Sequence, residues 1–274
     1  MNKMISVTIV ERLAELPWYT EGPAMDAQGN LFFTTLTGGI IFKMNPEGKM
    51  SHWAYAKCPN GQYILPNGDH LICDSGQAGI ARFGADGGFK SYAIKDHCDG
   101  QALRAPNDLT ADTDGGMYFT DSVRQSGMVC YFGTDGSQRI VGSGFDFPNG
   151  IALSADGKRL FVAESYRNRI LTCALRGPGL PDGKWEEWAR LPEHPSGDII
   201  QNLPDGIRMG KDGLLYVAHY GMQAVQILDE DGTLVDTIRT GYPLTSNLCL
   251  LEGEMIVTGG YGEPGPGGVS SIKL

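Results

Sequence analysis

The sequence has no cluster of basic residues and no long apolar run, and both absences exclude kinds of partner. Its 22 Lys and Arg residues are outnumbered by 32 Asp and Glu residues, which gives a formal net charge of -10. An acidic chain without a basic patch is a poor ligand for nucleic acid or anionic membranes. A membrane-spanning helix needs about 20 consecutive apolar residues, and no stretch approaches that length. We therefore expect neither nucleic acid nor a membrane as partner.

Cysteine is also scarce, with six residues in a chain of 274 and no C-x-x-C pair. Disulfide frameworks are typical of much shorter secreted chains, so we expect reduced, buried thiols. The first segment, MNKMISVTIVERLAEL, has a short apolar patch that Glu11 and Arg12 interrupt, and it has no small-residue cleavage site. These features predict a cytoplasmic protein.

Several common catalytic signatures are missing as well. The sequence has no G-x-S-x-G elbow, no H-E-x-x-H pair and no Walker loop, which argues against the hydrolase and nucleotide-binding classes that depend on them. Long helical periodicity is absent, whereas the 39 glycines are scattered at turn positions. Many tight turns indicate many short strands.

Six of these glycines mark a repeat. Each closes a turn between two short apolar segments, and successive glycines are 39, 47, 42, 56 and 40 residues apart: Gly29, Gly68, Gly115, Gly157, Gly213 and Gly253. Asp-Gly and Asn-Gly turns of this kind join the strands of β-hairpins, because the turn needs a positive φ. More strand and turn follow each hairpin, so each unit holds about four strands, the content of a propeller blade.

The sequence therefore predicts an all-β protein, a six-bladed β-propeller that forms a single domain over residues 1–274. The sixth unit is short, and the strand-like segment ISVTIV, residues 5–10, has no blade of its own. We expect this N-terminal strand to pair with the last blade and close the ring, which would remove an exposed sheet edge.

A second register lies eight residues before the marker glycines. Every position in it carries a side-chain oxygen: Glu21, Asn60, Asn107, Asn149, Asp205 and Thr245. Asn and Asp favour turns, which is the alternative interpretation of any one of them, but turn preference does not require the same offset six times. In a propeller, equivalent positions converge on the axis. Carboxylates and amide carbonyls gathered there resemble a site for a hard cation such as Ca²⁺.

The phrases EGP at 21, PND at 106, PNG at 148 and PDGI at 204 occur in order, each before a hairpin turn. In this respect the chain resembles the SMP-30/gluconolactonase/luciferin-regenerating enzyme family. The resemblance implies a six-bladed propeller with metal ligands at Glu21, Asn149 and Asp205, and with Asn107 as a fourth ligand or a substrate contact. It also implies hydrolysis of sugar lactones or related esters with one divalent ion, Ca²⁺ first, with Zn²⁺, Mn²⁺ or Mg²⁺ as alternatives.

We assign the roles as follows. Asp205 is the predicted catalytic residue, acting as a metal ligand and as the base for water, and Glu21 is the anchoring ligand. Arg104, in LRAPND, is a predicted substrate contact, with an exposed loop arginine as the alternative. His219 ends a strand and is a predicted substrate contact or proton carrier, with a structural histidine as the alternative. Asp74 and Asp121, at the corresponding strand ends, are interpreted as turn-capping acids.

Two other functions stay open on the same residues. The first is a non-catalytic propeller that binds calcium or a ligand, and the second is a phosphotriesterase-like hydrolase, an activity of a distant branch of the family that the chain resembles. The partner expected on the leading hypothesis is a small lactone, and the sequence carries no pattern that fixes the oligomeric state.

Overall fold

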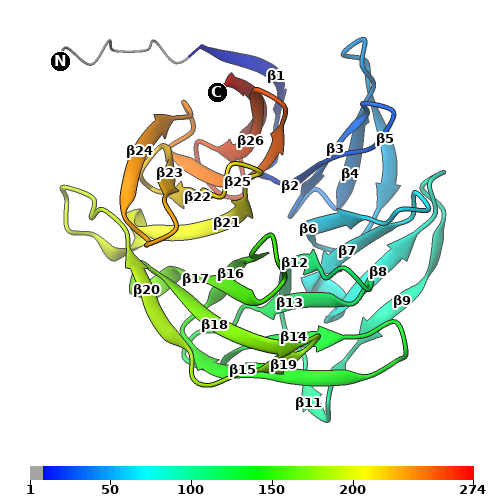
Figure 1. The fold of residues 1–274 in the computed structure, drawn as a ribbon. Helices are drawn as coiled ribbons and strands as arrows, with labels where there is room; N and C mark the ends of the chain where they lie inside the picture. Colours follow the sequence, from blue (N-terminus) through cyan, green and yellow to red (C-terminus); the bar gives the residue numbers. More distant parts are fainter. Residues whose placement is uncertain (1–8) are drawn as a thin grey trace.

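The computed structural model describes residues 9–274, and this part of the chain consists of strands, turns and three short 3-10 helices. The 3-10 helices are η1 (Ser75–Gln77), η2 (Ser165–Arg167) and η3 (Ile199–Gln201). No helix within residues 9–274 is long and apolar enough to cross a membrane. The sheets follow one another around a common centre in chain order, from blue to red in Figure 1. The predicted all-β class is confirmed.

Three of the sheets consist of four sequential strands, each antiparallel to the next. The first sheet comprises β2 (Thr20–Met25), β3 (Leu31–Thr35), β4 (Ile40–Met44) and β5 (Met50–Tyr55). The second comprises β6 (Pro59–Ile64), β7 (His70–Asp74), β8 (Gly79–Phe83) and β9 (Phe89–Lys95). The third comprises β12 (Pro106–Ala111), β13 (Met117–Asp121), β14 (Gly127–Phe132) and β15 (Gln138–Phe145). The short strands β10 (His97–Cys98) and β11 (Gln101–Ala102) form a hairpin between the second and third sheets.

The second half of the chain continues the pattern with additions. The fourth sheet comprises β16 (Pro148–Leu153), β17 (Arg159–Glu164), β18 (Arg169–Gly177) and β20 (Glu186–Arg190), with β19 (Leu180–Pro181) paired to β18. An eight-stranded sheet then comprises β21 (Leu203–Met209), β22 (Leu215–Tyr220), β23 (Ala224–Leu228), β24 (Leu234–Arg239), β25 (Leu244–Leu251), β26 (Glu254–Gly260), β27 (Gly267–Lys273) and β1 (Val10–Leu16). A single residue pair, Tyr220 with Leu244, joins its two halves.

The first and last strands of the described chain pair with each other. β1 is antiparallel to β27, with Val10 opposite Ile272 and Leu16 opposite Gly267. The pairing strand therefore begins at Val10, at the end of the ISVTIV segment that the sequence pointed to. Residues 5–8 of that segment lie outside the described residues.

The six marker glycines lie in turns, as expected. All six have positive φ, between 67° and 83°. Each turn joins the first two strands of a group, so the hairpin prediction is confirmed. At the first of them, the Asp26 carboxylate accepts hydrogen bonds from the backbone N–H groups of Gln28 and Asn30, which fixes the turn around Gly29.

The core lies between neighbouring sheets. The second strands are buried along most of their length, and β3, with the sequence LFFTT, is buried at every residue. One apolar cluster joins Leu71 and Ile80 of the second sheet to Met117 and Phe119 of the third. The outer strand β5 is mostly exposed. Four cysteines are buried and two are half-buried, and all six are free thiols, so the expected thiol state is confirmed.

His70, at the start of β7, gives the fold a predicted pH dependence. It is 2% exposed, lies 4.5 Å from Phe32 and 4.3 Å from Trp53 between ring centroids, and shares a hydrogen bond with Gln62. Burial lowers the pKa of His70 to about 4. In the unfolded chain His70 is protonated as pH falls below about 6.5, whereas in the folded chain it stays neutral until about pH 4. Stability is therefore lost as pH falls from 6.5 toward 4.

We expect His70→Gln to remove this loss. Between pH 8 and pH 5, burial of His70 should lower the free energy of unfolding of the wild type by about 2 kcal/mol, and the variant should not show this decrease. Urea unfolding at several pH values measures the difference, with the exposed His97 replaced by Gln as control. Parallel stability curves for the wild type and His70→Gln would contradict the assignment.

Candidate active site

The first strands of the sheets bring polar side chains to one pocket. β2 contacts β6, β6 contacts β12, β12 contacts β16, β16 contacts β21, β21 contacts β25, and β25 contacts β2. The starts of β2, β6, β12, β16 and β21 surround a pocket of about 240 Å³. Five members of the predicted register line it: Glu21, Asn60, Asn107, Asn149 and Asp205. The structure thus brings together all four predicted metal ligands.

The register residue of each first strand lies within a bulge or directly beside one; Glu21, for example, pairs with Thr34 just before the shift in β2. In β21, Pro204 pairs with His219 and the next pair is Ile207 with Val217, so Asp205 and Gly206 have no partner residue in β22. The same shift separates Pro148 from Ile151, around Asn149. A bulge bends the strand and redirects a side chain. The Asp205 and Asn149 side chains therefore lie in the pocket.

The sixth member of the register is Ser246 rather than Thr245. Thr245 pairs with Gly259 as Pro204 pairs with His219, so Ser246 occupies the position equivalent to Asp205. Counting back from Gly253 fails because the β25–β26 turn has two residues, between the paired Leu251 and Glu254. Thr245 is fully buried and donates a hydrogen bond to the Tyr242 carbonyl at 2.8 Å. Thr245 is therefore a structural residue.

Two carboxylates of the pocket are buried without a basic partner in its lining. Glu21 is 3% exposed and Asp205 is 8% exposed. Burial raises the pKa of Glu21 to about 8, with a further increase from Asp108, although the N–H of Gly22 opposes the shift by donating to the carboxylate at 3.0 Å. Burial, followed by the charge of Glu21, raises the pKa of Asp205 well above its usual range. The pocket is therefore deficient in positive charge.

Two amide oxygens in the same pocket also lack partners. Among the buried side chains of residues 9–274, Asn60 Oδ1 and Asn149 Oδ1 accept no hydrogen bond. A buried acceptor without a donor is costly. A cation bound by carboxylate and amide oxygens would satisfy these atoms and both carboxylates, and oxygen ligands of this kind suit Ca²⁺. The residues present therefore fit a divalent cation.

The arrangement depends on amides as well as acids. Within the described part of the chain, no group of three or more His, Cys, Asp or Glu side chains could hold a metal ion. Glu21 and Asp205 supply only two acidic ligands, so a cation here would also need the oxygens of Asn149 and of Asn107, which is partly buried.

Strand-end acids position the residues that precede the register. The Asp74 carboxylate accepts hydrogen bonds from the N–H groups of Lys57 and Cys58, just before Asn60. Asp121 does the same for Arg104 and Ala105, at 2.9 and 2.6 Å, just before Asn107. Glu164 accepts from the N–H of Asp146, before Asn149. Asp74 and Asp121 are therefore structural acids that bond to backbone N–H groups, but these groups belong to the segment before the first strand of the same sheet, and Asp74 does not cap η1, the turn that follows it.

Arg104 and His219 do not line the pocket. The Arg104 side chain is exposed and donates a hydrogen bond to the Ser126 hydroxyl at 3.0 Å. His219 is fully buried, its nearest polar partner is the side chain of Gln226 at 3.4 Å, and burial lowers its pKa to about 3, so it is neutral. Both placements match the alternatives left open by the sequence, and the proposed substrate contacts stay predictions.

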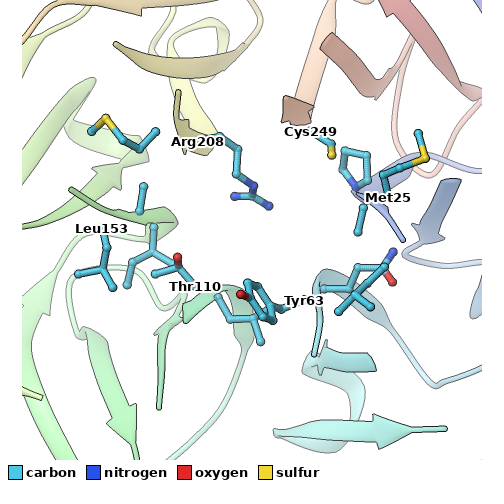
Figure 2. A pocket seen from close by; sticks show the side chains of 14 residues that line it. Met25, Tyr63, Thr110, Leu153, Arg208 and Cys249 are labelled. Carbon is cyan, nitrogen blue, oxygen red and sulfur yellow. The ribbon is translucent and has the colours of Figure 1, made fainter. Parts of the chain in front are cut away.

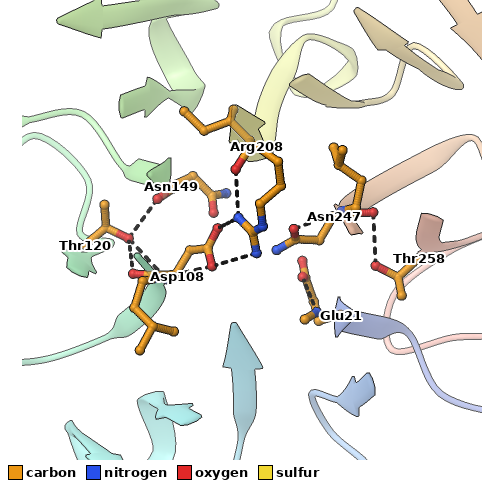
Figure 3. A network of polar contacts seen from close by, with 11 residues as sticks. Glu21, Asp108, Thr120, Asn149, Arg208, Asn247 and Thr258 are labelled. Atoms are coloured by element: carbon orange, nitrogen blue, oxygen red, sulfur yellow. Dashed lines mark hydrogen bonds and ion pairs between the residues drawn. The ribbon is translucent and has the colours of Figure 1, made fainter. Parts of the chain in front are cut away.

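The sequence analysis missed an ion pair at the base of the pocket. Arg208 donates to both carboxylate oxygens of Asp108, at 2.8 and 3.3 Å, and to the Ile207 carbonyl at 2.7 Å. The Asp108 side chain is fully buried. Figure 3 shows Asp108, Arg208 and Asn247 pointing toward one another from three different strands.

Glycines make room for this group. A Cβ on Gly61 would lie 2.5 Å from Asp108 Oδ1, and a Cβ on Gly206 would overlap the Asn247 amide. These glycines directly follow Asn60 and Asp205 in the sequence. Small residues beside the register therefore let longer polar side chains from other strands occupy the axis.

A second pocket, of about 350 Å³, lies at the later residues of the same strands (Figure 2). Arg208 points into it, and Met25, Tyr63, Thr110 and Cys249 are among the residues that line it. Asn107 lines the first pocket, and the next residue, Asp108, holds Arg208. The ion pair therefore lies between the two pockets.

Glu263 is a second residue that the sequence analysis missed. It lines the first pocket from the loop between β26 and β27, in the segment GEPGPGG. Tyr19, Leu36 and Phe147 line the same pocket, and Tyr19 meets Tyr220 edge-on with ring centroids 6.4 Å apart. An acidic residue in a glycine- and proline-rich loop was the available signal.

The fold and the pocket define a class of protein: an all-β, propeller-like arrangement of antiparallel sheets with carboxylate and amide oxygens gathered at the starts of the first strands. Residues 19–258 match the family model described as SMP-30/Gluconolactonase/LRE-like region, and the chain belongs to this family. The resemblance seen in the sequence is confirmed.

Relatives and solved structures agree with this assignment. The chain is 30% identical over 255 residues to "Lactonase drp35" of Staphylococcus aureus (strain USA300), covering 84% of this chain and 74% of the relative. It is 27% identical over 277 residues to a "Gluconolactonase" of Zymomonas mobilis, covering 89% and 76%. A gluconolactonase structure from Xanthomonas campestris has a TM-score of 0.84 at 24% identity, covering 98% of this chain and 91% of that one. The calcium-binding protein regucalcin from Agrobacterium tumefaciens gives 0.77 at 17%, covering 97% and 93%. The two structural likenesses show the fold.

Proposed function

We propose that the protein is a divalent-cation-dependent lactonase that opens a small lactone, an aldonolactone by preference. The observation that carries the proposal is the meeting of two buried carboxylates and two unpaired amide oxygens in one pocket. The names of the relatives, lactonase and gluconolactonase, support the reaction class. Glu21, Asp205, Asn149 and Asn107 would hold the ion, Ca²⁺ first, with Zn²⁺, Mn²⁺ or Mg²⁺ as alternatives.

The bound cation would supply Lewis acidity toward the lactone carbonyl and acidify nearby water. Asp205 would take the proton of the attacking water, because its carboxylate lies in the same pocket as the other proposed ligands. Glu21 anchors the ion, held in place by the N–H of Gly22. Tyr19 and Phe147 shield the lactone ring from solvent. The product is a hydroxy acid.

Removal of the metal tests the proposal. Treatment with a chelator is expected to reduce hydrolysis of aldonolactones by about 100-fold or more, and added Ca²⁺ or another divalent ion should restore it. A pH-stat assay over a panel of lactones measures the rate directly. Full turnover by the chelated protein would overturn the metal mechanism. Stabilisation by metal with no lactone turnover would support the non-catalytic binding protein, and turnover of phosphotriesters alone would support the other hydrolase.

We also infer that the fold is a single six-bladed propeller closed by β1. The closed circuit of contacts among β2, β6, β12, β16, β21 and β25 supports six blades. The pairing of β1 with β27 supports closure at the last blade. Free cysteines suit a reducing compartment, which favours the cytoplasm.

A further inference from the structure

Glu263 lies in a loop that is tightly seated beside the proposed cation site. The loop connects β26 to β27, and its backbone bonds to its neighbours: the N–H of Tyr19 donates to the Pro264 carbonyl at 2.8 Å, and the N–H of Tyr261 donates to the Pro266 carbonyl at 2.9 Å. A Cβ on Gly265 would overlap the backbone of Pro17. Glu263 itself is exposed and lines the pocket. Its carboxylate is therefore held at the solvent side of the site rather than in its buried part.

The pocket is lined by acids and by no base. Glu21, Asp205 and Glu263 line it, whereas no Lys, Arg or His does so among the described residues. Nearby arginines are engaged elsewhere: Arg208 with Asp108, and Arg124 with Asp146 at 2.6 Å. Three carboxylates against one divalent cation leave a net negative charge. An anionic substrate would meet no basic side chain in the lining and a repulsive carboxylate beside it.

We propose that Glu263 determines substrate specificity, by accepting a hydrogen bond from a hydroxyl of the substrate and by repelling anionic lactones. The substrate class is then an uncharged, hydroxylated lactone rather than a phosphorylated or carboxylated one. This inference rests on the proposed lactonase function. Glu263 is not needed for the reaction with water, because Asp205 and the cation site perform it.

The charge of Glu263 reaches the neighbouring groups of the pocket. After burial and the charge of Glu21, Glu263 is the next cause that raises the pKa of Asp205. It also contributes, after burial, Asp205 and Glu21, to the raised pKa of Tyr19. A substrate substituent that lies between these groups would also experience the negative charge of Glu263.

Three lactones with the same six-membered ring separate the two effects: glucono-1,5-lactone, its 6-phosphate, and unsubstituted δ-valerolactone. The wild type is expected to prefer glucono-1,5-lactone over the phosphate by about tenfold or more in kcat/KM. In Glu263→Gln, the KM for glucono-1,5-lactone should rise about threefold to tenfold with little change in kcat, because a charged acceptor is replaced by a neutral one. The same substitution should raise kcat/KM for the 6-phosphate, and it should change kcat/KM for δ-valerolactone by no more than about twofold.

Two further variants serve as controls. Glu263→Asp keeps the charge and should keep the discrimination against the phosphate. Glu230→Gln removes one charge from an exposed position in the turn after β23. This turn is far from the pocket, because it follows Leu228, whereas the other end of the β22–β23 hairpin, at His219, pairs with Pro204 beside Asp205. Glu230→Gln should therefore leave all three rates unchanged. Melting temperatures equal to that of the wild type show that the variants fold.

The outcomes separate this inference from the proposed function. If wild-type protein with added metal hydrolyses none of the three lactones, the proposed function fails and the inference fails with it. If all are hydrolysed and Glu263→Gln leaves the ratio between glucono-1,5-lactone and its phosphate unchanged, the inference alone is overturned. A wild-type preference for the phosphate overturns it as well.

Discussion

Asp205→Ala is expected to reduce kcat/KM for an aldonolactone by about 10³-fold or more, because it removes a metal ligand and the base for water together. Metal affinity should fall in parallel when the chelated protein is titrated with Ca²⁺ and followed by calorimetry. Stability should move in the opposite direction. Without metal, Asp205 is a buried carboxylate whose charged form is disfavoured, so the metal-free variant should unfold at a higher temperature than the metal-free wild type.

Asp114→Ala provides the control for Asp205. Asp114 is an exposed carboxylate in the turn between β12 and β13, and its loss should change neither the rate nor the calcium affinity. An Asp205→Ala protein that binds calcium as the wild type does and keeps more than about a tenth of its rate would contradict the assigned role, since general-base catalysis is worth at least ~10²-fold.

Arg208→Met is expected to destabilise the protein by about 3–5 kcal/mol, because it leaves the carboxylate of Asp108 buried without a partner. The guanidinium also bonds to the Ile207 carbonyl, which would lose a donor. Urea unfolding of the metal-free protein gives the free energy without a contribution from a bound ion.

The double variant Asp108→Asn with Arg208→Met separates the charge from the packing. It removes both charges, so most of the stability lost in Arg208→Met should return, with a coupling energy of about 2 kcal/mol or more in the double-mutant cycle. Additive effects of the two substitutions would show that the pair contributes packing alone.

The sequence predicted the parts of this molecule that repeat. Turn glycines such as Gly29 and Gly213 need positive φ in every unit, so their spacing gave the hairpins and the strand content. The fixed offset to Glu21, Asn149 and Asp205 then gave the lining of the pocket, because the same bulge occurs in each first strand. Residues that recur at a fixed spacing in every repeat can therefore be recognised from a single sequence.

What the sequence did not predict depends on contacts between distant segments. Asp108 and Arg208 are 100 residues apart, and only the ring arrangement makes them neighbours across the axis. Ser246 replaced Thr245 in the register because the β25–β26 turn has two residues where the β21–β22 turn has five. Glu263 lies in a loop outside the repeat. His219 shares the strand-end position of Asp121, but a buried neutral imidazole beside Gln226 cannot cap backbone N–H groups as a carboxylate does.

The ion pair of Asp108 and Arg208 also bears on how the proposed reaction would turn over. Because this ion pair lies between the two pockets, it separates the proposed site from the pocket that Met25 and Cys249 line. The hydroxy acid formed at the proposed site carries a new negative charge next to Glu21, Asp205 and Glu263. Repulsion between these carboxylates and the product favours its departure, so inhibition by accumulated product should be weak.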